Sequence, residues 1–174
     1  PDSVTTIGEN ALRGTAIEKL TLKSEFMDLL YDGTFGNSLK ELTITGELEI
    51  FDIGMISGQL NLQKLVIPDS VIGIVQSSEM DMPLALESMN LPQNLEFVDC
   101  FWLTEQSGRT VVDVYYDSVG YHFALDNSLD YRLRGVVFTS VSARPLNIFQ
   151  GQIAKLLIET EPAVDLTKLI EPQF

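Results

Sequence analysis

The only cysteine and the only histidine of the chain, Cys100 and His122, stand about one structural repeat apart in the sequence. A thiol that is activated by an imidazole is the nucleophile of thiol proteases. Cys100, however, lies in the apolar stretch 98–102, where a buried and unreactive thiol is the usual state, and no third residue is indicated that would orient His122. The chain also lacks the short motifs of serine hydrolases, phosphate-binding loops and zinc proteases. We therefore expect no enzyme activity.

Four carboxylates fall close together in the sequence and are candidates for a calcium site. They are Asp113, Asp117, Asp126 and Asp130. Calcium prefers such oxygen ligands, but their spacing does not match the known calcium loop, and residues 126–130 are typical of a turn in which Asp or Asn bonds the backbone. The sequence thus predicts no metal site and no cofactor.

The charge balance restricts the possible partners. The chain of 174 residues has 25 acidic and 11 basic residues, a formal net charge of −14, and no cluster of lysine or arginine. A protein that binds the phosphate backbone needs such a cluster, so nucleic acid is excluded as a partner. No apolar run is long enough to cross a membrane, so we expect no membrane insertion.

A six-residue phrase of the form L-x-x-L-x-L recurs along the chain, with other apolar residues at some of the leucine positions. Its copies begin at residues 17, 39, 62, 86, 111, 133 and 153, in steps of 20 to 25 residues. This is the period of a leucine-rich repeat solenoid. The predicted fold is such a solenoid, of α/β or mostly β class, with a curved parallel sheet on its concave side and loops and short helical turns on its convex side.

The phrase predicts a strand whose alternate residues enter a shared core. Stacking the strands in parallel would join their apolar faces into two ladders of side chains, one rung for each repeat. The first ladder comprises Leu20, Leu42, Leu65, Met89, Val114, Val136 and Leu156. The second comprises Leu22, Ile44, Ile67, Leu91, Tyr116, Phe138 and Ile158. Trp102, between Phe101 and Leu103, is expected in the convex part of the same core.

The segments between the phrases resemble the Bacteroides surface protein A-like family of leucine-rich repeats. The family pattern I-P-x-S-V-T-x-I-G-x-x-A-F is similar to PDSVTTIGENAL at residues 1–12, and PDSV recurs at residues 68–71. The resemblance is strong over about the first 95 residues and afterwards depends mostly on the strand period. It implies a bacterial protein of the cell surface or the extracellular space, active in adhesion or ligand binding and without a cofactor.

We expect one domain over residues 1–174, with seven coils in residues 1–158. Residues 159–174 either cap the last strand or begin a further coil. Because the chain opens inside a repeat, it is interpreted as a fragment of a longer protein, and the lack of a signal peptide says little about export.

The positions between the core residues of each strand face outward on the concave sheet, which binds ligands in most solenoids of this kind. In the C-terminal half this face becomes more apolar, and its candidate binding residues are Asp113, Tyr115, Val137, Lys155 and Leu157. The leading hypothesis is a non-catalytic module that recognises a protein or glycan ligand, such as a host extracellular molecule. The alternative is a structural spacer with no ligand of its own.

Overall fold

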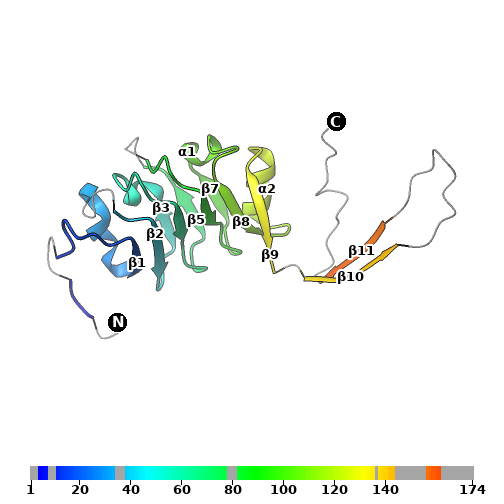
Figure 1. Ribbon diagram of the computed structural model, residues 1–174, viewed down its shortest axis with the longest axis horizontal. Coiled ribbons are helices and arrows are strands. Elements are labelled where there is room, and N and C mark those ends of the chain that lie inside the picture. The colour runs from blue at the N-terminus through cyan, green and yellow to red at the C-terminus, as the bar shows by residue number, and fades with distance from the viewer. Residues whose placement is uncertain are drawn as a thin grey trace. The chain divides into compact units, whose positions relative to one another are not determined.

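The computed structural model of the chain describes residues 4–7, 11–33, 38–77, 82–135, 137–143 and 156–161 (Figure 1). The chain divides into two compact units, Pro1–Arg132 and Leu133–Phe174. Each unit is described by itself.

The first unit contains most of a six-stranded sheet, called sheet A, whose strands follow one another in sequence order (Figure 1). The strands are β1 (Lys19–Lys23), β2 (Glu41–Thr45), β4 (Lys64–Val66), β6 (Ser88–Asn90), β8 (Val111–Tyr115) and β9 (Asp130–Arg134). The first five pair in parallel with their neighbours. The prediction of parallel strands in sequence order is therefore confirmed for the first five phrases.

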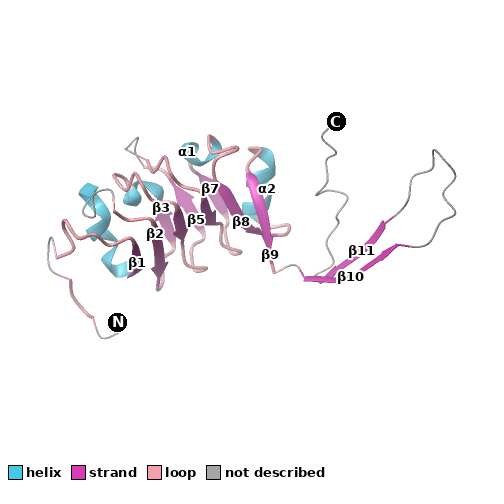
Figure 2. Ribbon diagram, in the orientation of Figure 1, coloured by secondary structure: helices cyan, strands magenta, loops and turns pink. Residues whose placement is uncertain are grey.

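A second parallel sheet, called sheet B, has three strands and was not predicted. Its strands are β3 (Ile50–Asp52), β5 (Gly73–Val75) and β7 (Phe97–Asp99), in that order. Each of them follows a strand of sheet A after a short turn, so three successive repeats contribute one strand to each sheet (Figure 2). In the first of these turns Gly46 has a φ of 90°, a left-handed conformation that glycine adopts without steric cost.

Short helices follow strands of both sheets. They are η1 (Ser24–Gly33), η2 (Ile53–Ile56), α1 (Phe101–Thr104) and α2 (Val119–Asp126). Ser118 caps α2, because its Oγ accepts a hydrogen bond from the backbone N–H of Tyr121 at 3.1 Å. In α1 the backbone N–H of Trp102 donates instead to Oε1 of Gln76, which lies one repeat earlier, at 2.8 Å. The expectation of short helical turns beside a parallel sheet is thus confirmed.

The core of the first unit is made by apolar side chains of both sheets and of the segments that join them. Leu42, Leu65 and Met89 of the first predicted ladder are buried, and Trp102 is buried as expected. Phe51 of β3 and Ile74 of β5 are fully buried as well. Leu20 is only half-buried, because β1 is the first strand of sheet A and has a paired strand on one side only among the described residues.

The predicted ladders need a correction at the fifth strand. In the observed register Met89 lies opposite Val112, and not opposite Val114 as predicted. Both valines are fully buried, whereas Tyr116 is only half-buried. The error has a simple cause: a shift of two residues leaves every side chain on the same face of a strand, so the apolar pattern does not distinguish the two registers.

The sixth and seventh predicted strands were also placed wrongly. The sixth strand of sheet A is β9, which begins three residues before the predicted phrase and ends before Gly135, whose φ is 72°. In the second unit, β10 (Val137–Ala143) pairs with β11 (Leu156–Glu161) in antiparallel orientation. Alternating apolar residues predict a strand but not the direction of its partner. Val136 lies outside the described residues, as do residues 162–174 of the predicted cap.

Polar side chains join each coil to the one before it. The amide of Asn90 accepts a hydrogen bond from the N–H of Ile67 at 2.8 Å and donates to its carbonyl at 2.9 Å. The hydroxyl of Thr110 donates to the carbonyl of Leu86 at 2.6 Å. Ser70, in the second PDSV segment, accepts from the N–H of Leu48 at 3.0 Å. Ser70 therefore stabilises the turn between β2 of sheet A and β3 of sheet B, in the coil before its own.

Candidate interaction surface

Asp113 and Tyr115 lie on the same face of β8, as the sequence predicted. They alternate with the buried Val112 and Val114, and both are partly exposed. The hydroxyl of Ser118 donates to the carbonyl of Tyr115 at 2.7 Å while it caps α2, so the end of β8 and the start of the helix are held together. This hydrogen bond to the backbone carbonyl of Tyr115 helps to hold the residue in place on the outer face of sheet A.

An ion pair crosses from β8 to β9 on this face. Nε of Arg132 donates to Oδ1 of Asp113 at 2.7 Å, and the carboxylate side chain is 30% exposed while the arginine is 62% exposed. The sequence reasoning missed Arg132 because it placed the sixth strand three residues too late. The alternation of charged residues with Tyr131 and Leu133 along β9 was the signal that could have found it.

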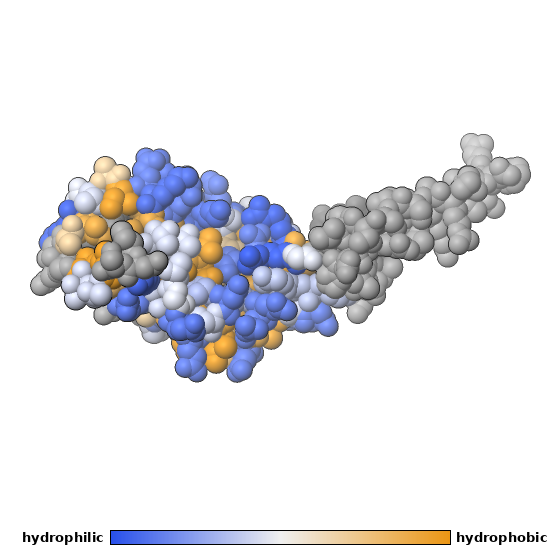
Figure 3. Space-filling view, turned by 90° about the horizontal axis from the view of Figure 1, so that it is seen from below, coloured by the Kyte–Doolittle hydropathy of each residue, from blue (hydrophilic) through white to orange (hydrophobic). Residues whose placement is uncertain are grey.

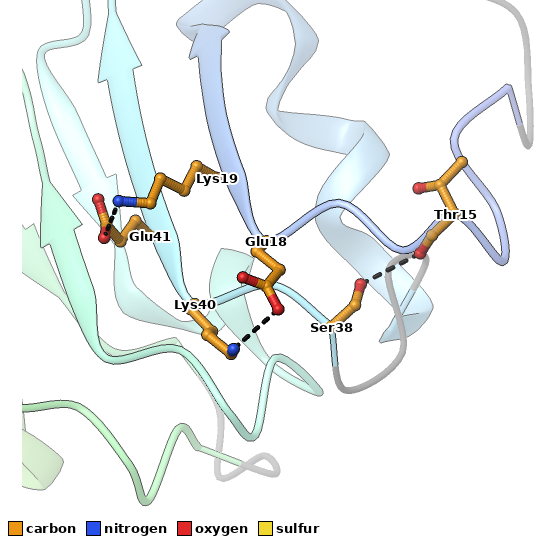
Figure 4. A network of polar contacts seen from close by, with 6 residues as sticks. All are labelled: Thr15, Glu18, Lys19, Ser38, Lys40 and Glu41. Atoms are coloured by element: carbon orange, nitrogen blue, oxygen red, sulfur yellow. Dashed lines mark hydrogen bonds and ion pairs between the residues drawn. The ribbon is translucent and has the colours of Figure 1, made fainter.

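The opposite end of sheet A also carries ion pairs between neighbouring coils (Figure 4). Nζ of Lys19 lies 2.6 Å from Oε1 of Glu41, and Nζ of Lys40 lies 2.8 Å from Oε1 of Glu18. The hydrogen bond from Lys40 lowers the pKa of Glu18, and the hydrogen bond to Glu41 raises the pKa of Lys19. All four side chains are at least 40% exposed, so these pairs add little stability, and their main effect is to neutralise charge within the chain itself.

The other three candidate residues do not join Asp113 and Tyr115 on sheet A. Val137 lies in β10 opposite Glu161, and Leu157 lies in β11 opposite Ser142. Both strands belong to the antiparallel pair of the second unit, so the expectation that they occupy the next rungs of the same parallel sheet was wrong. Lys155 lies outside the described residues. The candidate surface therefore consists of Asp113, Tyr115 and the newly found Arg132.

An aromatic cluster lies behind the end of β8. The ring of Tyr121 in α2 contacts three others, with centroid distances of 5.4 Å to Tyr116, 5.5 Å to Tyr131 and 5.3 Å to His122. Tyr121 is buried, and this burial raises the pKa of its hydroxyl to about 12. The cluster packs α2 against β8 and β9 and so supports the candidate surface.

Cys100 and His122 have different surroundings. The thiol of Cys100 is buried beside Gln76, with Sγ 3.8 Å from Oε1, and burial raises its pKa to about 11. The imidazole of His122 is exposed, and its Nε2 lies 2.9 Å from Oδ1 of Asp117. A thiol with a raised pKa is a poor nucleophile, because the thiolate is the reactive form.

Two of the four aspartates considered as calcium ligands are engaged in separate ion pairs. Asp113 pairs with Arg132, and Asp117 pairs with His122. Asn127 and Ser128 close the turn after α2, and Ser128 has a φ of 54°. Within the described ranges, no group of three acidic, histidine or cysteine side chains is arranged to hold a metal ion.

A pocket of about 280 Å³ lies beside β1, at the start of sheet A. It is lined by Val4, Ile7, Leu12, Leu20, Thr21, Leu22, Lys23, Phe26 and Thr45. Seen from below in Figure 3, hydrophilic side chains cover much of the first unit, and apolar side chains are visible at its N-terminal end and also near its middle. The pocket is mainly apolar, and its polar side chains among the described residues are those of Thr21, Lys23 and Thr45.

Comparison with known protein families gives a match for the first part of the chain. The family model of the BspA type leucine-rich repeat region matches residues 1–83 in six copies. No curated protein and no solved structure shows a significant match. Among the helices of the described residues, none is long and apolar enough to span a membrane.

Proposed function

Residues 1–83 belong to the BspA type leucine-rich repeat family, and from this premise we propose that the chain is a non-catalytic binding module of a bacterial surface or secreted protein. Its parallel strands would form a curved solenoid whose concave side is sheet A. The ligand would be a protein or a glycan outside the cell. The buried Cys100, apart in its bonding from His122, supports a role without catalysis.

One observation carries the proposal of a binding face. Asp113, Tyr115 and Arg132 present a carboxylate, an aromatic ring and a guanidinium on two adjacent strands of sheet A. Tyrosine and arginine are enriched at the energetic centres of interfaces, because a ring offers contact area at little entropic cost and a guanidinium offers several directed donors. The rigid strands below them would keep these groups in place for a ligand.

The proposal is tested by binding of the purified chain to immobilised glycans and extracellular proteins. For a ligand that binds here, Tyr115→Ala should weaken affinity by about 2 kcal/mol or more. Stability should change little, since a partly exposed side chain leaves no sealed cavity when it is shortened. Phe97→Ser, on sheet B, serves as the matched control and should leave this affinity unchanged.

The rival function is a structural spacer, and the two make different forecasts. A spacer would bind nothing on such arrays, and the Tyr115→Ala variant would behave as the unchanged chain does. If a ligand binds and neither Tyr115→Ala nor Arg132→Ala changes its affinity, the chain is a binding module, but its ligand does not bind at this face of sheet A.

A further inference from the structure

An apolar stripe crosses the outer face of sheet B. Ile50, Gly73 and Phe97 are paired in register on β3, β5 and β7, and we call them the sheet-B stripe. Ile50 is 38% exposed and Phe97 is 41% exposed. A Cβ atom on Gly73 would overlap both the Phe97 ring and Ile50, so these two side chains cover the glycine from the strands on either side of it. The result is one continuous apolar surface over three strands.

The surroundings of the sheet-B stripe are acidic. Asp52 and Asp99 stand two residues further along β3 and β7 and therefore share the outer face with Ile50 and Phe97. Residues 41–108 contain 11 acidic side chains and a single basic one, Lys64, which lies on β4 of sheet A. Within this stretch, which Lys40 and Arg109 flank, acidic side chains thus far outnumber basic ones.

The outer face of sheet A differs in this respect. Its acids Glu41 and Asp113 are paired with Lys19 and Arg132 on neighbouring strands. On sheet B, Asp52 binds uncharged groups, accepting hydrogen bonds from the N–H of Gly54 at 2.9 Å and from the hydroxyl of Ser77. Asp99 is exposed. Among the described residues, neither Asp52 nor Asp99 forms an ion pair, so an external cation could neutralise them.

We propose that the sheet-B stripe is a docking surface for a cationic protein segment that carries apolar side chains. The apolar side chains of the partner segment would cover Ile50 and Phe97, and its lysine or arginine side chains would pair with Asp99 and the neighbouring acids. Opposite charge speeds encounter and rejects wrong partners, while buried aromatic contacts supply most of the affinity. Anionic membranes and nucleic acids would be repelled by the same carboxylates. This surface is separate from the one on sheet A.

A synthetic peptide in which lysine alternates with phenylalanine is a suitable probe. Titrated into the isotope-labelled full chain, it should shift the backbone NMR signals of β3, β5 and β7 most, and its affinity should fall as salt is raised. Phe97→Ser should weaken binding roughly tenfold or more, as loss of a central aromatic contact does. Ile50→Ser is a second variant in case the first fails to fold. Tyr115→Ser, on sheet A, should bind the peptide as the unchanged chain does.

Two further peptides separate the stripe from general attraction to an acidic protein. A peptide that alternates lysine with serine keeps the charge but lacks apolar side chains, and one that alternates glutamate with phenylalanine reverses the charge. Both should bind much more weakly than the lysine–phenylalanine peptide. Equal binding of the lysine–serine peptide, the largest shifts on sheet A, or an unchanged affinity in both the Phe97 and the Ile50 variants would overturn the proposal.

Discussion

The side-chain amide of Asn90 bonds both polar backbone groups of Ile67, one repeat earlier in the chain. Asn90 is 5% exposed and Ile67 is 1% exposed, so water has little access to these groups. A buried backbone N–H and a buried carbonyl are costly when they lack a partner. The amide thus extends the pairing of β4 and β6 by one residue beyond the strands themselves.

Asn90→Ala should lower the free energy of unfolding by about 2 kcal/mol or more, because it leaves the N–H and carbonyl of Ile67 without partners. The measurement is chemical denaturation of the purified protein. Asn94→Ala is the matched control: the Asn94 side chain donates to the carbonyl of Asp69 at an exposed site, and its loss should cost less than about 1 kcal/mol. Equal losses in the two variants would contradict the role given to Asn90.

Leu42→Ala should destabilise the protein far more than Leu20→Ala, although both residues belong to the same ladder. Leu42 is fully buried between the neighbouring rungs, and truncation there should cost about 2–5 kcal/mol. Leu20 is only half-buried at the first strand, where the surroundings can relax. Thermal or urea unfolding of the two variants compares them directly. Leu42→Asp should prevent folding, because it would place an unpaired charge in the core.

Gly120→Ala should destabilise the protein, which is the opposite of the usual result in a helix. Alanine normally favours helix by up to about 1 kcal/mol over glycine. At Gly120, however, the added Cβ would lie 2.7 Å from Cβ of Leu91, and overpacking of this kind costs roughly 1–3 kcal/mol.

A double-mutant cycle checks the cause of that loss. In a Leu91→Gly background the Cβ of Leu91 that the new methyl group would meet is removed, so Gly120→Ala should cost less there than in the unchanged chain. Additive effects of the two substitutions would show that the contact between α2 and Leu91 is not the source of the destabilisation.

Cys100 should react slowly with iodoacetamide in the folded protein. Burial raises the pKa of its thiol from 9.0 to about 11, so at pH 8 about one molecule in a thousand holds the reactive thiolate, against about one in ten for a thiol of ordinary pKa. Mass spectrometry of the native and the urea-unfolded chain should show a rate difference of about 100-fold or more. Because the folded state favours the protonated thiol, this group also makes stability fall as the pH rises from about 9 to about 11. Similar rates in both states would place Cys100 at the surface.

The sequence predicts the first five strands of sheet A but none of sheet B, for a physical reason. Strands such as β2 carry two buried residues in alternation, and their recurrence in successive coils makes the pattern visible. The strands of sheet B read IFD, GIV and FVD, and their outward first residue changes from isoleucine to glycine to phenylalanine, so no phrase recurs from coil to coil. Arg132 was missed for another reason: its pairing with Asp113 depends on where β9 begins, and the apolar pattern around Leu133 placed that start wrongly.

The polar side chains that join the coils determine the order in which certain backbone groups can form their hydrogen bonds during synthesis. Ser70, Asn90 and Thr110 each bond the backbone of the coil that precedes their own. During synthesis from the N-terminus, the backbone groups of Leu48, Ile67 and Leu86 acquire these partners only after roughly another repeat has left the ribosome. Each coil in this stretch is therefore completed by its successor, and a ribosome that pauses between two coils would leave these groups of the most recent coil bonded to water until translation resumes.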